Sequence, residues 1–255
     1  MSCPTCPRNC GTGRANVVPD KRDDPIYVAL CMTLCEVRKE FCEGRHRGKT
    51  QSSVAEERAR NSPELRRAIQ NHSDPRIRGG ESAVNRERYV RYDNADPNWN
   101  RRRVDPRTIQ NHLDNIERQI RRQGARILAT RAGQAAARSW LKIVPILNII
   151  STAYDVYDIA SAGVDIVQQI QAAREQFSGD VYRIRPDVAV TGPNGQLQAA
   201  YDFKFDTDDW QPGQQELYAQ DLRNSGAANP EPQSVNAVDC GCDGPARINS
   251  AGAVG

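Results

Sequence analysis

The sequence has few aromatic residues and no long apolar run. Aromatic residues make up 6% and hydrophobic residues 38% of its 255 positions, enough for a compact core in only part of the chain. The most apolar window, residues 140–153, is interrupted by Lys142, Pro145 and Asn148 and is too short to span a bilayer. The N-terminus has cysteines and prolines where a cleavable signal peptide has a basic segment and an apolar run. We therefore expect no membrane span, and a protein that is soluble or leaves the cell without a cleavable signal.

Acidic and basic residues are unevenly divided along the chain. The 35 Lys and Arg residues nearly balance the 32 Asp and Glu residues, but from Ser178 onward 11 acidic residues face 5 basic ones. The excess of positive charge therefore lies in the first part, where residues 101–103 open the most basic tract. A basic surface attracts nucleic acid but equally suits an acidic protein partner, so charge alone does not choose between them.

Eight cysteines fall into three groups. They are Cys3, Cys6 and Cys10 in an N-terminal loop, Cys31, Cys35 and Cys42 on one face of a helix expected over residues 25–45, and Cys240 and Cys242 apart from both. The even count and the facing loop and helix favour disulfides, whereas the initial Cys-x-x-Cys favours zinc. Reduced cysteines acting as small hydrophobes are a third alternative. Each interpretation makes this region a scaffold.

The middle of the chain predicts little structure at first and then helices. Residues 45–100 are polar and broken by Gly and Pro, so we expect one helix with a Ser62 cap, ending near residue 71, and loops elsewhere. Residues 106–141 predict basic and then Ala-rich helices, whose arginines are better explained as a solvated face than as phosphate ligands. Residues 143–176 predict the most apolar helices, which we expect to cover the strands that follow.

Residues 181–220 predict two short strands, a tight turn and a helix. The strands are expected over residues 181–190 and 197–205, and the intervening Gly-Pro-Asn-Gly is typical of a hairpin in which Asn-Gly supplies the positive φ angles of a two-residue turn. We expect the acidic residues that follow, Asp206, Asp208 and Asp209, to be solvated loop residues.

Three charged residues on this hairpin are unusual for ordinary strands. Asp202 and Lys204 lie two residues apart, so they project to one face while Tyr201, Phe203 and Phe205 project to the other. Pairing across the turn can bring Asp187 close to them. Two carboxylates and an amine would be expensive to bury, so they need water or a cation. Oxygen ligands of this kind suit Mg²⁺ or Mn²⁺.

The order and spacing of these residues resemble the PD-(D/E)xK nuclease superfamily. Pro186-Asp187 is followed after fourteen residues by Asp202-Phe203-Lys204, and Gln214 and Tyr218 provide the Gln-x-x-x-Tyr element of several branches. The resemblance covers the last third of the chain and is nearest to VRR-NUC proteins and to restriction-endonuclease-fold toxins of bacterial secretion systems.

The resemblance implies a role for each residue. Asp187, Asp202 and the backbone carbonyl of Phe203 would bind the metal, and Lys204 would orient the attacking water. Gln214 and Tyr218 would face the metal or the nucleic-acid backbone. Relatives often place a Glu on the helix before the first strand, and Glu175 is the candidate here.

We therefore expect an α+β chain with an α/β core, in which a helical N-terminal two-thirds precedes a small nuclease core made of a β-hairpin and flanking helices. The expected regions are a cysteine-rich, basic region for delivery (residues 1–105), basic and then apolar helices (106–158) and the nuclease domain (159–255).

The resemblance also implies a biological role. It suggests a Mg²⁺- or Mn²⁺-dependent endonuclease, for DNA more than RNA, that acts in the cytoplasm of a target bacterium as a secreted effector. A cognate immunity protein would neutralise it, and a secretion-apparatus or chaperone protein would bind its N-terminal region. The alternatives are a housekeeping or phage-type structure-specific repair nuclease, and a non-catalytic adaptor with a degenerate nuclease fold.

Overall fold

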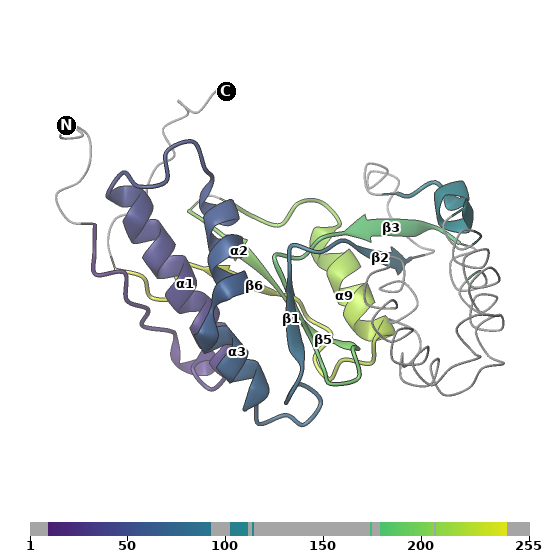
Figure 1. The fold of residues 1–255 in the computed structure, drawn as a ribbon, viewed down its shortest axis with the longest axis horizontal. Helices are drawn as coiled ribbons and strands as arrows, with labels where there is room; N and C mark the ends of the chain where they lie inside the picture. The colour runs from purple at the N-terminus through teal and green to yellow at the C-terminus, as the bar shows by residue number, and fades with distance from the viewer. Residues whose placement is uncertain are drawn as a thin grey trace, which may run out of the picture.

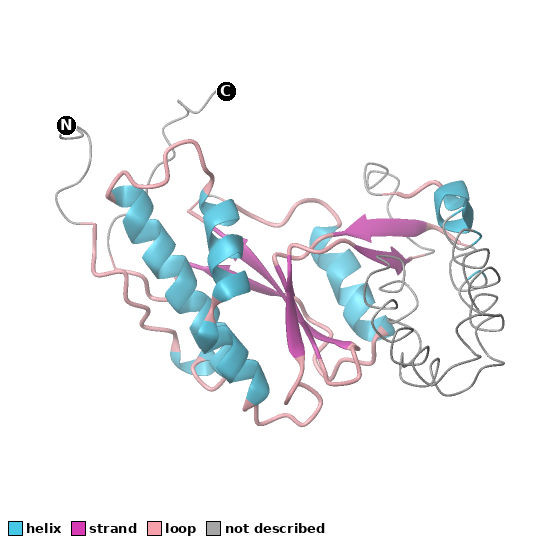
Figure 2. Cartoon of the chain, in the orientation of Figure 1, coloured by secondary structure: helices cyan, strands magenta, loops and turns pink. Residues whose placement is uncertain are grey.

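The structure is a computed structural model that describes residues 10–92, 103–111, 114, 174, 179–206 and 208–243. The helices expected over residues 106–141 and 143–176 lie almost entirely outside these ranges, and so does Glu175. The described elements are η1 (Pro19–Lys21), α1 (Pro25–Cys42), α2 (Gln51–Asn61), α3 (Pro63–Gln70), β1 (Glu81–Val84), β2 (Arg88–Arg91), β3 (Val181–Ile184), β4 (Val188–Thr191), β5 (Leu197–Lys204), α9 (Gln214–Asn224) and β6 (Gln233–Asn236) (Figures 1 and 2). This is a mixed α+β arrangement, as predicted.

Side-chain caps fix the starts of the three N-terminal helices. Asp24 accepts from the backbone N–H groups of Ile26 and Tyr27 at the start of α1. Thr50 and Ser62 cap α2 and α3 in the same way, because each side-chain oxygen satisfies an N–H that the first helical turn leaves without a partner. Helices α1 and α3 confirm the prediction. The prediction of a loop where α2 lies is wrong.

Strands from both halves of the chain form the sheets. The larger sheet has the order β1-β4-β5-β6, in which β5 and β6 are parallel and the other pairs are antiparallel. Strands β2 and β3 form a separate antiparallel pair. Two expectations are therefore wrong: the described N-terminal part is not purely helical, and the single strand expected over residues 181–190 is two strands in different sheets. Pro186 lies in the break, where it cannot donate a ladder hydrogen bond.

The hairpin between β4 and β5 forms as predicted, but its turn is longer than expected. The N–H of Gly195 donates to the carbonyl of Gly192 (2.9 Å), and the N–H of Gly192 donates to the carbonyl of Gln196 (2.9 Å). Gly195 has a φ of 79°, whereas Asn194 is not among the described residues with a positive φ. The prediction of a two-residue Asn-Gly turn is therefore wrong, because a single glycine in the left-handed region closes a wider loop.

Helices cover both faces of the larger sheet. Helices α1, α2 and α3 lie on one side and α9 lies on the other (Figure 1). The first face buries Tyr201, Phe203 and Phe205 with residues of α1 and α2 in one hydrophobic cluster. The second face packs Leu197 and Ala200 with Leu217, Tyr218 and Leu222 of α9. The cover expected from residues 143–176 is thus supplied on the first face by α1–α3, so residues of the expected 1–105 and 159–255 regions share one core.

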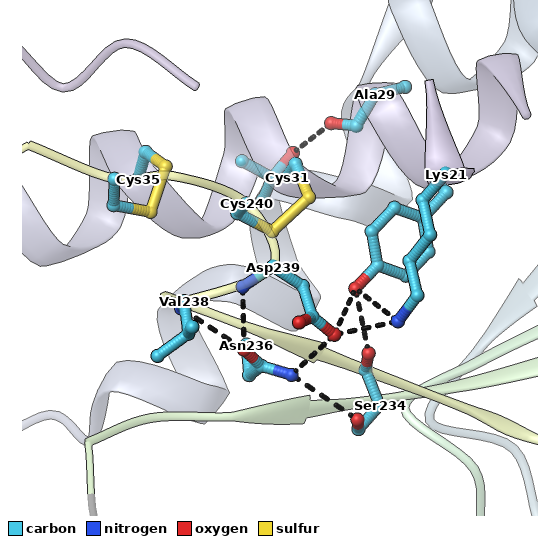
Figure 3. The surroundings of a disulfide bond; sticks show 12 residues. Lys21, Ala29, Cys31, Cys35, Ser234, Asn236, Val238, Asp239 and Cys240 are labelled. Carbon is cyan, nitrogen blue, oxygen red and sulfur yellow. Dashed lines mark hydrogen bonds and ion pairs between the residues drawn. A yellow bond between two sulfur atoms is a disulfide. The ribbon is translucent and has the colours of Figure 1, made fainter. Parts of the chain in front are cut away.

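Three disulfides join the chain ends to α1. They are Cys10–Cys42, Cys31–Cys240 and Cys35–Cys242. The disulfide interpretation therefore holds for these six cysteines, but the expected pairing of the loop group with the helix group occurs only once. Figure 3 shows Cys240 against α1, with the neighbouring Asp239 bonded to Lys21 (2.6 Å) and to Asn236 (2.9 Å). The segment after β6 is thus held by covalent and polar contacts.

No helix of the described part is both long enough and apolar enough to cross a bilayer.

Two backbone segments approach closely beside β4, and we expect Gly80→Ala to disrupt this contact. A Cβ at Gly80 would lie 1.8 Å from the carbonyl oxygen of Thr191, so the backbone would have to shift. We expect the free energy of unfolding to fall by about 2–3 kcal/mol, as for an overpacked core. Urea unfolding followed by circular dichroism measures this change.

The matched control is Gly48→Ala. Gly48 has a φ of 77° and open space around its Cα, so the substitution adds only backbone strain, of about 1 kcal/mol. Equal losses in the two variants would show that the contact between Gly80 and Thr191 is not tight.

Candidate active site

Strand β5 places Asp202 and Lys204 on one face, as predicted. Lys204 Nζ lies 2.6 Å from Asp202 Oδ2, and both side chains are nearly buried. The same amine donates to the carbonyl of Asp209 (3.1 Å) and lies 4.5 Å from the centre of the Trp210 ring. A carboxylate, a carbonyl and an aromatic face therefore hold the ammonium group in one position.

Helix α9 adds an amide and a phenol to this pair. Gln214 Nε2 lies 3.2 Å from each carboxylate oxygen of Asp202 and 3.0 Å from the hydroxyl of Tyr218. Gln214 and Tyr218 are four residues apart, so they share one face of the helix. The Tyr218 hydroxyl donates to the backbone carbonyl of Arg185 (2.8 Å). Of the predicted site residues, the structure thus brings Asp202, Lys204, Gln214 and Tyr218 into one hydrogen-bonded cluster.

Asp187 reaches the same strand from the start of β4. Its Oδ2 accepts from the backbone N–H of Phe203 (2.8 Å), beyond the last β4–β5 pair, Val188 with Tyr201. The carboxylate therefore satisfies a donor that the ladder leaves open. Phe203 contributes its N–H to this contact, and metal binding by its carbonyl stays a prediction.

The pKa of Asp187 is strongly raised. Burial disfavours its charged form, and the charges of Asp202 and Glu56 disfavour it further, so its pKa rises from 3.8 to about 8 despite the N–H of Phe203 and the charge of Lys204. A bound proton or a nearby cation would therefore stabilise the buried carboxyl group of Asp187.

Glu56 of α2 is a third carboxyl group at this place, and the sequence did not indicate it. Burial raises the pKa of Glu56, against opposing effects of Arg185 and of hydrogen bonds with Asn85 and Asp187. The charge of Glu56 in turn contributes to the raised pKa of Asp187. The Asn85 amide donates to Glu56 Oε2, and Asn85 has a φ of 56° that places it in the left-handed region. Glu175, the candidate for a Glu on the helix before the first strand, lies outside the described residues.

Asp206, two residues after Lys204, is not a solvated residue. Its side chain is 4% exposed and forms an ion pair with Arg38 of α1 (3.1 Å). The expectation of a solvated loop residue is wrong here, because α1 packs over the end of β5. The contact fixes the end of the strand that carries Asp202 and Lys204.

The cluster fits a hydrated divalent cation better than a fully enclosed one. Within the described ranges, no group of three or more His, Cys, Asp and Glu side chains is placed to hold a metal ion. Mg²⁺ usually keeps several waters and uses one or two carboxylates, with substrate phosphates as further ligands. Asp187 and Asp202 supply two such carboxylates, and a nearby positive charge would stabilise the charged forms of Asp187 and Glu56, whose pKa values are both raised by burial.

Comparisons of the chain with protein-family models, with curated proteins and with solved structures give no match.

We expect Asp187→Asn to stabilise the metal-free protein at pH 8. Because the folded-state pKa of Asp187 is raised, the native state retains a proton that the unfolded chain loses above about pH 4. The free energy of unfolding therefore falls as pH rises from about 4 to about 8, by up to about 1.4 kcal/mol per pH unit from this group. Asn keeps an oxygen for the N–H of Phe203 and does not titrate.

Urea unfolding in chelator at pH 5 and pH 8 measures this difference. Asp208→Asn is the control, since Asp208 is exposed. The wild-type protein and Asp208→Asn should lose stability across this interval more steeply than Asp187→Asn does. The same slope in all three proteins would contradict the raised pKa of Asp187.

Proposed function

We propose that this protein is a metal-dependent nuclease that hydrolyses phosphodiester bonds, with DNA as its preferred substrate. The observation that carries the proposal is the contact of Lys204 with Asp202 on one face of β5, beside Asp187 at the start of β4. An amine and carboxylates at this spacing, with Gln214 and Tyr218 on the next helix, match the residue pattern of the PD-(D/E)xK nucleases. The mixed sheet between two helical layers is compatible with a nuclease core of that kind.

The residues of the cluster divide the work of hydrolysis. Asp187 and Asp202 would hold a Mg²⁺ or Mn²⁺ ion, with Glu56 beside Asp187. When bound, this cation supplies the positive charge that polarises the scissile phosphate and lowers the pKa of a water molecule. Lys204 Nζ donates to Asp202, to the Asp209 carbonyl and, at 3.4 Å, to Gln214 Oε1, so it would release its longest contact to donate to the attacking water or to a phosphate oxygen.

Gln214 and Tyr218 act on Asp202. The Gln214 amide contacts both oxygens of its carboxylate, and Tyr218 accepts from the same amide and so keeps it in place, as supporting residues commonly do for ligands of a metal. Trp210 packs edge-on against Tyr218, with ring centres 5.8 Å apart, and covers the Lys204 amine. These contacts exclude water from one side of the amine and keep its direction constant.

A plasmid cleavage assay tests the proposal. Purified protein with Mg²⁺ or Mn²⁺ should nick or linearise plasmid DNA, and EDTA should stop the reaction. A structured RNA in parallel reactions determines the preferred nucleic acid. Absence of cleavage of every substrate under these conditions would reject the nuclease proposal.

We further propose that the protein is an antibacterial effector that acts in the cytoplasm of a target bacterium. The three disulfides support passage through an oxidising compartment, where such bonds form and persist. A cognate immunity protein would block the active site, and the N-terminal region would bind a chaperone or a component of the secretion apparatus. Expression in a bacterial strain with an oxidising cytoplasm, where the three disulfides can form, should arrest growth, and the product of a neighbouring gene should relieve the arrest. Unaltered growth would favour the housekeeping nuclease.

A non-catalytic adaptor is the second candidate function. The near-complete burial of Asp202 and Lys204, which form an ion pair with each other, favours it. Titration calorimetry with Mn²⁺ distinguishes the two, because a nuclease site should bind the ion and an adaptor need not. Binding that disappears in Asp202→Asn would exclude the adaptor.

A further inference from the structure

The end of β1 and the residue after it contact two arginines as well as Glu56. Arg60 of α2 places Nη2 3.5 Å from the carbonyl oxygen of Val84, and Arg185 places Nε 3.4 Å from the carbonyl oxygen of the next residue, Asn85. These are long contacts, so each guanidinium group is guided by a backbone oxygen but not strongly bound to it. Two cations from different elements therefore flank the turn whose Asn85 side chain holds Glu56.

Neither arginine forms an ion pair with another described residue, and both are exposed. Some other described arginines are paired with carboxylates. Arg58, on the same helix, pairs with Glu36 (3.0 Å) and Glu40 (2.9 Å), and Arg88 is buried against Asp221. The guanidinium groups of Arg60 and Arg185 therefore retain N–H donors for a ligand.

Both arginines are tied to the candidate active site. Arg60 lies one helical turn after Glu56 on α2. Arg185 lies two residues before Asp187, and its carbonyl accepts the hydrogen bond of Tyr218 (2.8 Å). A ligand that contacts the two side chains would thus lie next to the carboxyl groups of Glu56 and Asp187.

We propose that Arg60 and Arg185 form a phosphate subsite that binds the nucleic-acid backbone beside the scissile position. A guanidinium group donates two parallel N–H bonds to a phosphate, and exposed donors that form no ion pair with a described carboxylate are suited to this contact. The proposal rests on the nuclease function proposed above. It identifies the ligand as a phosphodiester backbone, shared by DNA and RNA, and not a base.

The charges near the site agree with this ligand. Three carboxyl groups, Glu56, Asp187 and Asp202, face three cations, Arg60, Arg185 and Lys204. Because the pKa of Asp187 is raised to about 8, the three cations outnumber the charged carboxylates at neutral pH, and a divalent cation adds further positive charge. An anionic nucleic-acid backbone would balance this positive charge. Without the two arginines, the carboxyl groups would repel the same anionic ligand.

Fluorescence anisotropy in EDTA tests the subsite without cleavage. The probes are fluorescein-labelled single-stranded DNA, duplex DNA and single-stranded RNA of about 20 nucleotides. Arg60→Gln/Arg185→Gln should raise the Kd about tenfold or more and reduce the slope of log K against log salt for duplex DNA by about 2, one for each lost phosphate contact. Arg60→Lys/Arg185→Lys retains the charge but not the planar guanidinium group, so its Kd should lie between those of the wild-type protein and the Gln double variant.

The control variant is Arg45→Gln/Arg67→Gln. It removes the same charge from two exposed arginines that pair with Glu43 (2.9 Å) and Glu64 (3.0 Å), so both Kd and salt slope should stay near wild type. Thermal melting verifies that each variant is folded.

Two results would overturn the subsite. One is an equal rise in Kd for the two Gln double variants, which would show that Arg60 and Arg185 act only through the net charge of the protein. The other is Mn²⁺ binding that becomes tighter in Arg60→Gln/Arg185→Gln with no change in nucleic-acid affinity, because the arginines would then only balance the carboxyl groups. Plasmid cleavage by the wild-type protein is measured separately. If the wild-type protein cleaves DNA but Arg60→Gln/Arg185→Gln binds nucleic acid normally, only the subsite is rejected. If that variant loses affinity but the wild-type protein cleaves no substrate, only the nuclease is rejected.

Discussion

Removing the disulfides Cys31–Cys240 and Cys35–Cys242 together is expected to lower the free energy of unfolding by about 5 kcal/mol or more. These bonds join residues 209 and 207 positions apart, so they restrict the unfolded chain strongly. The loop-entropy relation assigns about 5 kcal/mol to a single loop of this length. Because a typical domain is stable by only about 5–15 kcal/mol, this loss is a large part of the total.

The two bonds should not contribute additively. Once one of them is closed, the other closes only the short ring that passes through residues 31–35 and 240–242, to which the same relation assigns about 2–3 kcal/mol. Replacing either pair by Ala should therefore lower the unfolding free energy much less than replacing both pairs. Urea unfolding of the single-pair and double-pair variants measures this, with the wild-type protein in a phosphine reductant as a further comparison.

Reduction also bears on the candidate site. Strand β6, which the cross-linked segment follows directly, pairs in parallel with β5 and places Ser234 beside Asp202 and Asn236 beside Lys204. Reductant should therefore lower cleavage together with stability. An unfolding midpoint that does not move in reductant would show that these cross-links do not constrain the folded protein.

Local rules predicted the parts of the fold that depend on residues close in sequence. Helix α1 follows from its Asp24 cap and the Pro in its first turn. The two-residue spacing of Asp202 and Lys204 and the four-residue spacing of Gln214 and Tyr218 fix which side chains share a face. These short spacings are enough to place most of the candidate site.

Long-range pairing explains what the sequence did not predict. Strand β1 is four residues long and pairs with β4, with Glu81 opposite Thr191, so its partner is far away in the chain. Helix α2 buries only Gln51, Val54, Ala55 and Ala59, which is too weak an apolar pattern to stand out from a polar region. The Thr50 cap and the Ala, Glu and Arg residues after it were the available signals.

The missed position of Glu56 follows from the missed helix. Its place beside Asp187 depends on how α2 packs on the sheet, which local sequence does not encode. Cysteine connectivity has the same limit, since spacing alone does not select among the possible pairings. Asp206 differs again: it has the composition of a loop, and only the packing of α1 over the end of β5 pairs it with Arg38.

Lys204→Met is expected to lower the rate of DNA cleavage by about a thousandfold. Among the described residues, the Lys204 amine is the basic group that pairs with Asp202, and loss of a single donor to transition-state charge commonly lowers kcat by about 10²–10³. Its second role in orienting the water adds to this loss. Lys49→Met is the control, because Lys49 is an exposed lysine that pairs with Glu57 at 3.0 Å. Plasmid cleavage in excess Mg²⁺ gives the rates.

A second substitution separates this chemical effect from a structural one. Lys204→Met leaves the carboxylate of Asp202 buried without its cation, which typically lowers stability by about 3–5 kcal/mol. Adding Asp202→Asn removes the buried charge, so Lys204→Met/Asp202→Asn should regain much of that stability while it stays inactive. If the double variant recovered cleavage together with stability, Lys204 would act only through the fold. Cleavage at the wild-type rate by a folded Lys204→Met protein would remove Lys204 from the proposed mechanism and leave the two carboxylates to account for any activity.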